Sequence, residues 1–353
     1  MAEIAVFGGM GEVGSYVVEA LRALGYHPAI IGRQPRPEVA NYQRADLFDA
    51  RRVEEICASH DMVINAAGPA AVIRDHVARI ALLKGVPYVD VGGEEDVFTS
   101  LAERQGQASS PCVLGAGFVP GFSSLLAYLV RKKMQRVDKF ELYVGGIEVF
   151  TPTSAKDFLA SLSQRESYSG CGVVGGRITR IATREGVAPI PGAPVFSALP
   201  YLSAEHQRVA RSLSFDHYRA YNLIADKHLV LADQGDPSGR LNALVAASEA
   251  LTSQHGTQQY CVVHARGWLA DQPVRFELNC RFDNGYRLTG WVAAVTADQL
   301  IRRSRRQRPS LCWLSEAVEI ESLLEQLSQA NLFRHWEMSL TPDEEVVFEE
   351  GVL

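Results

Sequence analysis

Ile4-Ala5-Val6-Phe7-Gly8-Gly9-Met10-Gly11-Glu12-Val13-Gly14 is the stretch of sequence that decides the fold. Its four leading apolar residues predict a short buried strand, and the glycines that follow break the strand sharply. Beyond Gly14, the apolar residues Val17, Leu21 and Leu24 recur at helical spacing until Gly25 ends the pattern. The segment therefore predicts a strand, a glycine turn and a helix in direct succession.

The same alternation continues along the next hundred residues. Further short apolar runs, each ending in a small or polar residue or a glycine turn, are Pro28–Ile31, Met62–Asn65, Tyr88–Val91 and Cys112–Leu114. A short third strand is expected around Tyr42–Ala45, before Asp46 and ahead of the fourth at Met62–Asn65. Helical patterns separate most of these runs, and the runs are too apolar for either face to meet water, which is typical of a parallel sheet covered on both sides. We expect an α/β domain over residues 1–130, with a doubly wound parallel sheet of the Rossmann type.

The pattern changes after residue 135. Lys139–Val144, Gln259–Trp268 and Val274–Phe282 alternate polar and apolar residues, as antiparallel strands with one covered face do. We predict a second, α+β domain over residues 131–290 with a mainly antiparallel sheet. Residues 291–353 are expected to form C-terminal helices that partly return to the first domain, although no proline-rich linker fixes the boundary.

Composition excludes several classes of protein. The 353 residues are 47% hydrophobic and 22% charged, as in ordinary globular proteins, and the net charge of −6 with no long basic block argues against a nucleic-acid partner. The six cysteines are far apart and form no cluster with metal-ligand spacing, so we expect no metal site and a reduced, cytoplasmic chain. No run of 18 apolar residues is present, so no membrane span is expected.

The glycine turn matches G-x-G-x-x-G at Gly9, Gly11 and Gly14, with Gly8 adding an overlapping glycine. Glycine allows the sharp turn, the close approach of backbone to a pyrophosphate and the tight packing of the helix, whose amino end then faces the negative charge. The position after a strand and before a helix favours a dinucleotide site over a plain turn. The predicted contacts are Gly8, Gly9, Met10, Gly11, Glu12, Val13 and Gly14.

The residues after the second strand indicate which coenzyme is bound. Where an NAD-preferring domain carries a carboxylate for the ribose 2′-hydroxyl, the sequence has Gly32-Arg33, with Arg36 close by. A guanidinium suits a 2′-phosphate, so the sequence favours NADP(H); if Arg33 is only a solvated loop residue, the preference stays open. Asp46 is either an acceptor for the adenine amino group or an ordinary loop residue.

The end of the fourth strand is expected to line the nicotinamide side of the coenzyme. Backbone amides followed by small residues leave room there for the ribose and phosphates. The residues predicted for this contact are Asn65, Ala66, Ala67, Gly68 and Pro69.

Four separated motifs resemble the saccharopine dehydrogenase-like family of NAD(P)-dependent oxidoreductases. They are Gly8–Gly14, Val63–Pro69, Tyr88–Glu94 and Gly115–Gly121, in that order, and the resemblance is confined to about the first 130 residues. It implies a Rossmann-type coenzyme domain and chemistry at carbon–nitrogen bonds, as in saccharopine, opine and carboxynorspermidine dehydrogenases; a few relatives are enoyl reductases.

The chain is also similar to the thiazolinyl imine reductases of enantio-pyochelin siderophore biosynthesis, which are compact enzymes of this kind. That resemblance implies hydride transfer from NADPH to the C=N carbon of a thiazoline, giving a thiazolidine. The small-molecule imine substrate would be tethered to a carrier domain of a nonribosomal peptide synthetase. A homodimer is expected as well.

Reduction of an imine also requires a proton donor near the strand ends. Asp90 and Glu94 flank the Gly92-Gly93 turn, although a turn carboxylate that caps backbone amides has the same pattern. Tyr168 precedes the glycine-rich stretch 170–176. His217 is predicted to cluster with Tyr218 and Tyr221 on a helical face, with aromatic packing as the alternative.

Other reactions lack support in the sequence. There is no G-x-S-x-G, H-E-x-x-H or Walker motif, and no Tyr-x-x-x-Lys follows the fourth strand. Two alternatives stay open. A saccharopine- or opine-type dehydrogenase acting on free amino and keto acids would need converging arginines, for which Arg177, Arg180 and Arg184 are candidates. A non-catalytic protein that senses NADP(H) would bind the coenzyme without losing hydride from it.

Overall fold

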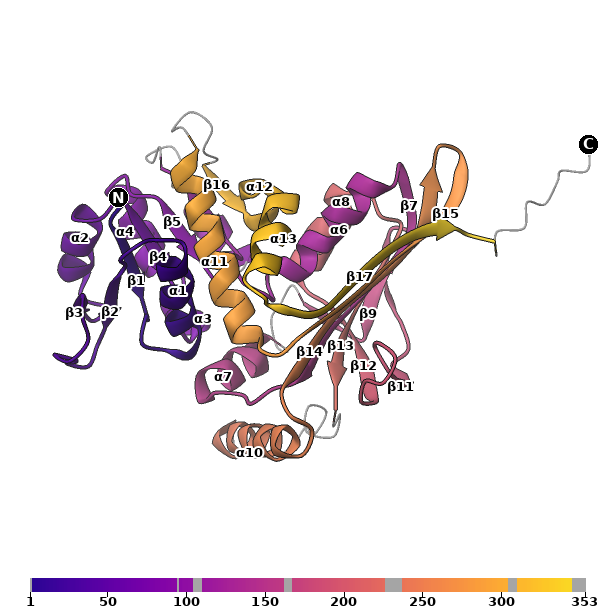
Figure 1. Ribbon diagram of the computed structural model, residues 1–353, viewed down its shortest axis with the longest axis horizontal. Helices are drawn as coiled ribbons and strands as arrows, with labels where there is room; N and C mark the ends of the chain where they lie inside the picture. The colour runs from indigo at the N-terminus through magenta and orange to yellow at the C-terminus, as the bar shows by residue number, and fades with distance from the viewer. Residues whose placement is uncertain are drawn as a thin grey trace, which may run out of the picture.

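The computed structural model describes residues 2–93, 95–103, 110–161, 167–225, 237–303 and 310–344. Two sheets dominate it, one at each end of the molecule (Figure 1). The first is parallel, with the strand order β16-β6-β5-β4-β1-β2-β3. Its strands are β1 (Ile4–Phe7), β2 (Ala29–Gly32), β3 (Tyr42–Arg44), β4 (Met62–Asn65), β5 (Tyr88–Asp90), β6 (Cys112–Leu114) and β16 (Leu311–Trp313).

Helices cover both faces of this sheet. In β1, Ile4 and Val6 belong to one apolar cluster and Ala5 and Phe7 to another, as expected for a strand buried on both sides. The helices of this half are α1 (Glu12–Ala23), α2 (Ala50–Ala58), α3 (Ala70–Ile73), α4 (His76–Leu83), α5 (Glu95–Ala102), α11 (Gly285–Arg302), α12 (Leu314–Ala317) and α13 (Ile320–Gln329). The predicted doubly wound sheet is confirmed.

Helix α11 returns from the second domain and packs directly against α1 (Figure 1). A Cβ at Gly290 would lie only 2.6 Å from the Cβ of Tyr16, so the two helices can approach this closely only because residue 290 is glycine. The contact brings the chain after the second sheet back to the half of the molecule that holds the first sheet.

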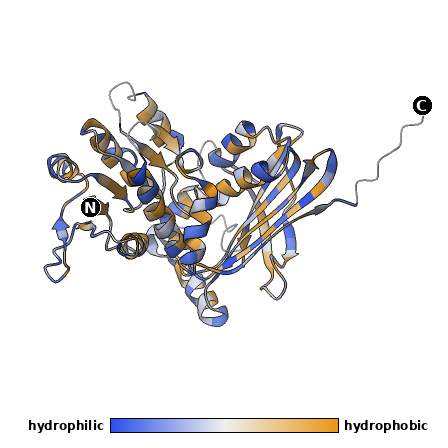
Figure 2. Cartoon of the chain, turned by 45° about the horizontal axis from the view of Figure 1, so that its top comes forward, coloured by the Kyte–Doolittle hydropathy of each residue, from blue (hydrophilic) through white to orange (hydrophobic). Residues whose placement is uncertain are grey.

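The second sheet is mixed and mainly antiparallel, with the order β10-β9-β13-β7-β14-β15-β17 along its main path. Its long strands alternate hydrophobic and hydrophilic residues, which Figure 2 shows as alternating colours. Strands of this half are β7 (Arg136–Ile147), β8 (Tyr168–Ser169), β9 (Cys171–Val174), β10 (Arg177–Arg180), β11 (Arg184–Val187), β12 (Phe196–Leu202), β13 (His217–Ile224), β14 (Gln258–Leu269), β15 (Gln272–Phe282) and β17 (Phe333–Pro342). Its helices are α6 (Phe122–Lys133), α7 (Pro152–Ser161), α8 (Ala204–Ser212) and α10 (Pro237–His255).

One apolar core runs through both halves. It contains Val89 and Val113 of the first sheet, residues of α6, and Phe140 and Val263 of the second sheet. The C-terminal segment contributes to both sheets, because β16 adds an edge strand to the first and β17 pairs with β15 in the second. The expectation of helices over 291–353 is therefore incomplete, since two strands lie there as well.

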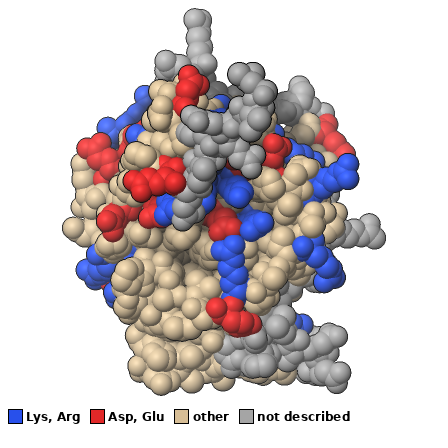
Figure 3. All heavy atoms as spheres, turned by 90° about the vertical axis from the view of Figure 1, so that its right-hand side faces the viewer, with Lys and Arg blue, Asp and Glu red and all other residues tan. Residues whose placement is uncertain are grey.

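Two further features of the described residues bear on the sequence expectations. None of the described helices combines the length and the apolar character needed to cross a membrane. Figure 3 views the end of the molecule on the right of Figure 1, and the Lys and Arg side chains visible there are interspersed with Asp and Glu.

Candidate coenzyme and substrate site

The glycine turn between β1 and α1 forms a bare backbone surface. Gly8 has a φ of +73°, and a Cβ there would lie 2.6 Å from the Cα of Ala67 in the loop after β4. A Cβ at Gly14 would overlap with the carbonyl oxygen of Gly8. Both positions therefore exclude every side chain, for a left-handed conformation in one case and for tight helix packing in the other.

The amino end of α1 leaves backbone donors available. Gly11 is the N-cap and provides no side-chain cap, and its own N–H donates to Gly8 O at 2.8 Å. The first N–H groups of a helix have no partner within the helix, and they carry the positive end of the helix dipole. A diphosphate can bind at such a place without any basic side chain.

Arg33 and Arg44 lie close together at the place where a Rossmann-type domain would bind the 2′-phosphate of NADP(H). Arg33 follows β2 and is exposed, and Arg44 ends β3 opposite Gly32. Arg44 Nε donates to the carbonyl oxygen of Arg33 at 3.1 Å. Among the described residues, neither guanidinium has an acidic partner within ion-pair distance. Arg44 was not predicted, although its position at the end of the predicted third strand is a signal that sequence reasoning could have used.

Arg36 and Asp46, the other residues predicted to contact the adenosine part of the coenzyme, each bond to a residue close by in the sequence. Arg36 forms an exposed ion pair with Glu38 at 3.6 Å. The Asp46 carboxylate accepts the N–H of Phe48 at 3.0 Å, which is the hydrogen bond of an Asx turn. This turn uses one carboxylate oxygen of Asp46, and the adenine contact stays a prediction.

Asp90 lies inside a buried network at the ends of β4 and β5. Its carboxylate accepts from Asn65 Nδ2 at 3.0 Å, from the Tyr88 hydroxyl and from the Gly92 N–H at 3.0 Å. Burial raises the pKa of Asp90, and these three donors oppose that shift. The network fixes the loops on either side, as the capping alternative for Asp90 predicts. Glu94, the other predicted carboxylate, lies outside the described residues.

Helix α7 of the second domain contacts the loop after β4. Asp157 accepts the N–H of Ala70 at 2.9 Å and so caps the start of α3. A Cβ at Gly68 would lie 2.7 Å from Thr153 Cγ2, so the predicted nicotinamide loop 65–69 is closed on one side by α7. Burial raises the pKa of Asp157.

Helix α8 of the second domain contacts the next two loops of the first sheet. Glu205 Oε1 accepts the N–H of Gly121, in the loop after β6, at 3.0 Å. One turn further along α8, Arg208 pairs with Glu95 at 2.9 Å and stacks 3.6 Å from the centroid of the Trp313 ring. The face of α8 that carries Glu205 and Arg208 therefore lies across the ends of β5, β6 and β16.

A third acidic residue of the second domain caps α11. Glu148, directly after β7, accepts the N–H of Gly285 at 2.9 Å. Burial, together with the nearby carboxylate of Glu12, raises the pKa of Glu148 to about 8, against the opposing effect of the backbone N–H donors. Glu12 is the first residue of α1, so Glu148 lies beside the glycine turn.

Two predicted catalytic residues lie elsewhere in the second domain. Tyr168 is exposed in the two-residue strand β8, where it pairs with Leu202 just before α8. His217 begins β13, whose register pairs Tyr218 with Phe140 and Leu223 with Gly145. His217 therefore lies at one end of β13, and the opposite end, which pairs with Gly145, is close to where β7 leads into Glu148.

The helical face predicted for His217, Tyr218 and Tyr221 is wrong, because the segment is a strand. Side chains three residues apart on a strand point to opposite faces, and Tyr218 and Tyr221 accordingly lie in different apolar clusters. The aromatic packing alternative fits this arrangement.

The three arginines considered for substrate carboxylates do not converge. Arg177 and Arg180 are the ends of the exposed edge strand β10. Arg184 pairs with Glu141 at 2.7 Å and lies 4.8 Å from the centroid of the Tyr221 ring. Arg219 contacts the same carboxylate at 3.2 Å, so Glu141 is shared by two guanidinium groups, which together with Tyr143 hold its pKa below its usual range against burial.

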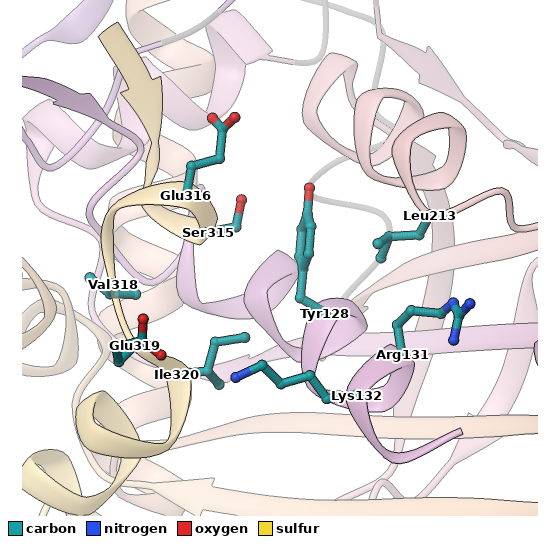
Figure 4. Close-up of a pocket in the computed structure, with 9 residues that line it drawn as sticks. All are labelled: Tyr128, Arg131, Lys132, Leu213, Ser315, Glu316, Val318, Glu319 and Ile320. Atoms are coloured by element: carbon teal, nitrogen blue, oxygen red, sulfur yellow. The ribbon is translucent and has the colours of Figure 1, made fainter. Parts of the chain in front are cut away.

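A groove of about 350 Å³ lies between α6 and the segment around α12. In Figure 4 the Tyr128 ring stands between Ser315 and Leu213, and Lys132 extends toward Ile320. The wall formed by α12 follows Trp313 directly, and none of the lining residues belongs to the glycine turn. It is lined by Tyr128, Arg131, Lys132, Leu213, Ser315, Glu316, Val318, Glu319 and Ile320.

The residues that close the substrate side were missed by sequence reasoning. Glu148, Asp157, Glu205 and Arg208 have no local motif, because each contacts a segment distant in the sequence. Across the described ranges, no group of three His, Cys, Asp or Glu side chains could hold a metal ion.

Comparison with known proteins agrees with this architecture. Residues 4–127 match the model of the NAD dependent epimerase/dehydratase family, which covers the first sheet as far as α6. Apo saccharopine dehydrogenase (L-Glu forming) from Saccharomyces cerevisiae is similar over 96% of this chain and 100% of that one, with a TM-score of 0.69 and 12% identity. DAP dehydrogenase of C. glutamicum in complex with DAP covers 94% of this chain and 99% of its own, with a TM-score of 0.52 and 14% identity.

An engineered D-amino acid dehydrogenase bound to NADP+ is similar to the same degree. It covers 94% of this chain and 99% of its own, with a TM-score of 0.52 and 13% identity. At these identities the likeness establishes the fold, which is a Rossmann-type domain followed by a mixed-sheet domain.

Proposed function

We propose that the chain is an NADPH-dependent oxidoreductase that reduces a carbon–nitrogen double bond, with a thiazolinyl imine as its substrate. The observation that carries the proposal is the glycine turn 8–14, where a side chain at Gly8 or Gly14 would collide with backbone and the amino end of α1 has no side-chain cap. Such a surface fits a diphosphate. Gly8, Gly11 and Gly14 would contact the diphosphate, and Arg33 and Arg44 the 2′-phosphate.

Bound NADPH supplies the hydride for the reduction. The contribution of the chain is to place the C=N carbon beside the nicotinamide and to exclude water. The loop 65–69, the Gly92-Gly93 turn and the loop 115–121 form one side of the substrate space, and α7 and α8 form the other. Support for chemistry at a carbon–nitrogen bond comes from the resemblance to saccharopine dehydrogenases and from the likeness in fold to the saccharopine and DAP dehydrogenases.

Arg208 and Arg184 already have acidic partners, and this favours an imine substrate without free carboxylates. Arg208, which faces the ends of β5 and β16, is already paired with Glu95, and Arg184 is paired with Glu141, which it shares with Arg219. A thiazoline held through a thioester on a carrier domain has no free carboxylate at that position, so it needs no unpaired arginine. The fold likeness to saccharopine dehydrogenase keeps a second candidate, a dehydrogenase of free amino and keto acids, which would require these ion pairs to open.

A substrate competition tests the proposal. The purified chain is mixed with NADPH, and the nicotinamide absorbance is followed with an aryl thiazoline thioester or, separately, with keto acid and amine pairs. We expect oxidation of NADPH with the thiazoline and little with the acids. Oxidation with keto acid and amine alone would favour the amino-acid dehydrogenase, and tight NADPH binding without any oxidation would favour the sensing protein.

A further inference from the structure

A buried polar cluster lies behind the loop after β6, outside the contacts discussed for the coenzyme. It consists of the buried side chains of Ser124 in α6, His206 in α8 and Tyr218 in β13, with the half-buried Glu205 of α8 beside them. The His206 and Tyr218 rings lie 5.6 Å apart between centroids. Polar groups inside an apolar core are costly unless they serve a purpose or hold ordered water.

Three polar atoms of the cluster lack a hydrogen-bond partner within the part of the chain that the structure describes. Ser124 Oγ, Tyr218 Oη and His206 Nε2 are buried and have no partner at good hydrogen-bond geometry among the described residues. Ser124 nevertheless lies close enough to Glu205 and to Tyr218 to lower the pKa of both groups, against the effect of burial. Ordered water between these groups would connect Tyr218, Ser124 and Glu205 into one chain.

Glu205 is the member of the cluster that reaches the substrate side. Its carboxyl group bonds to Gly121 N–H at the edge of the first sheet, and Arg208 on the same face of α8 reaches Glu95. In open α/β sheets the ligand lies beyond the carboxyl ends of the strands. A substrate between the ends of β5 and β6 and helix α8 would therefore meet Glu205 on the side opposite the coenzyme.

The groups around Glu205 determine how it holds a proton. Burial raises the pKa of Glu205, and Arg208 lowers it. The elements packed around it contribute the hydroxyl groups of Tyr128 and Tyr218, and burial raises the pKa of Tyr218. Glu95 across the interface is paired with Arg208. His206 stays neutral, because burial lowers its pKa to about 4. No unpaired cation among the described residues faces the carboxyl group.

We propose that Glu205 is the proton donor of the reduction, with Ser124 and Tyr218 as the chain that positions and reloads it. The inference rests on the proposed function. As the imine carbon receives hydride from the reduced coenzyme, the π electron pair of the C=N bond forms a bond from nitrogen to the Glu205 proton. Glu205 is left as a carboxylate and takes a new proton from solvent, and the coenzyme leaves oxidised.

The decisive experiment compares two substrates with the same ring. A neutral thiazoline needs a proton at nitrogen, whereas its N-methyl thiazolinium analogue does not. Glu205→Gln should slow single-turnover reduction of the neutral thiazoline by about 100-fold or more, the usual contribution of general acid catalysis. Reduction of the thiazolinium should change less than about threefold. The matched control is Glu321→Gln, an exposed carboxylate of α13 that pairs with Lys132 and should leave both rates unchanged.

Two further measurements keep the proposal falsifiable if Glu205→Gln folds poorly. Glu205→Asp retains a carboxylic acid and should recover part of the loss on the neutral substrate only. In the infrared difference spectrum of the wild type minus Glu205→Gln at neutral pH, a protonated carboxyl band should remain, because the band of Glu148 is common to both proteins and cancels. Equal loss on both substrates, or no protonated band in this difference spectrum, would overturn the assignment of Glu205 alone. Failure of the wild type with both substrates would overturn the proposed function.

Discussion

The two sides of the candidate site are built in opposite ways. The coenzyme side is local, because Gly8, Gly11 and Gly14 lie within one turn of chain, and side chains are excluded at Gly14 by Gly8 and at Gly8 by Ala67 in the loop after β4. The substrate side is assembled from distant pairs, with Ala70 and Asp157 separated by 87 residues and Glu95 and Arg208 by 113. A backbone site can therefore be recognised from a short motif, whereas a site built from side-chain pairs cannot.

Substitution of Gly14 should have the largest effect on the coenzyme side. In Gly14→Val the new side chain would overlap with the Gly8 carbonyl, so either the turn or the start of α1 must move. We expect NADPH affinity, measured by nicotinamide fluorescence, to fall by more than about 100-fold, since close backbone approach is lost. Gly239→Ala is the control: position 239 lies in α10 with open space around it, so affinity should not change. Unchanged affinity in Gly14→Val would show that the turn does not hold the coenzyme.

The Glu148 carboxyl group, which caps α11, tests whether the stability of the contact between the two sides of the site depends on pH. Its pKa in the folded chain is about 8, above the ordinary 4.5, so the folded state binds a proton that the unfolded state releases. Its contribution to stability is full below about pH 4.5 and is lost as the pH rises toward 8.

The variant Glu148→Gln lacks this titration. Between pH 5 and pH 8, the free energy of unfolding of the wild type should fall relative to that of Glu148→Gln by roughly 2–4 kcal/mol. Urea denaturation at several pH values measures this difference, and the other buried carboxyl groups cancel because both proteins contain them. Parallel pH profiles for the two proteins would mean that Glu148 is not held protonated.

Substitutions of Arg33 and Arg44, at the ends of β2 and β3, test whether these arginines bind the 2′-phosphate and so set the preference for NADPH. Arg33→Asp removes a cation from the expected 2′-phosphate position and adds a carboxylate, and Arg44→Ala removes its neighbour. Each substitution should weaken NADPH binding by about 10- to 100-fold, the range of one charge-assisted hydrogen bond. NADH binding should change little. Arg51→Asp, at an exposed arginine of α2, serves as the control; equal weakening of both coenzymes would contradict the role of Arg33.

Arg208 tests the substrate side against an equivalent arrangement elsewhere in the molecule. Arg208 joins Trp313 and Glu95 across the domains, and Arg136 joins Trp268 and Asp138 on the exposed end of the second sheet. Arg208→Ala should lower the free energy of unfolding by about 2 kcal/mol, since a partly buried ion pair and a cation–π contact are both lost. Arg136→Ala should cost less than about 1 kcal/mol. Equal losses would show that the interdomain position adds nothing.

The sequence predicted β1, β2, β4, β5 and β6 because each is an apolar run that ends at or just before a glycine or a small polar residue, whereas the edge strand β16 was not predicted. The same local signal identified the glycine turn, Arg33 and the loop 65–69. It misassigned the segment 217–221, because spacings of three and four residues among aromatic side chains occur by chance in a strand that buries both faces.

The acidic contacts of the second domain could not be predicted in the same way. Asp157, Glu205 and Glu148 each accept a backbone N–H, and a backbone donor leaves no residue-specific trace at the partner position. Asp90 had the opposite difficulty: its place at a strand end suggested catalysis, and only the positions of Asn65 and Tyr88 reveal a buried network.

Calorimetric titration of the folded wild-type chain with NADPH and then with NADH tests the central claim most directly. If the uncapped start of α1 and the glycine turn bind the coenzyme diphosphate, NADPH should bind with one site per chain and more tightly than NADH. Absence of measurable binding for both nucleotides, in a sample whose fold is verified by circular dichroism, would contradict the account.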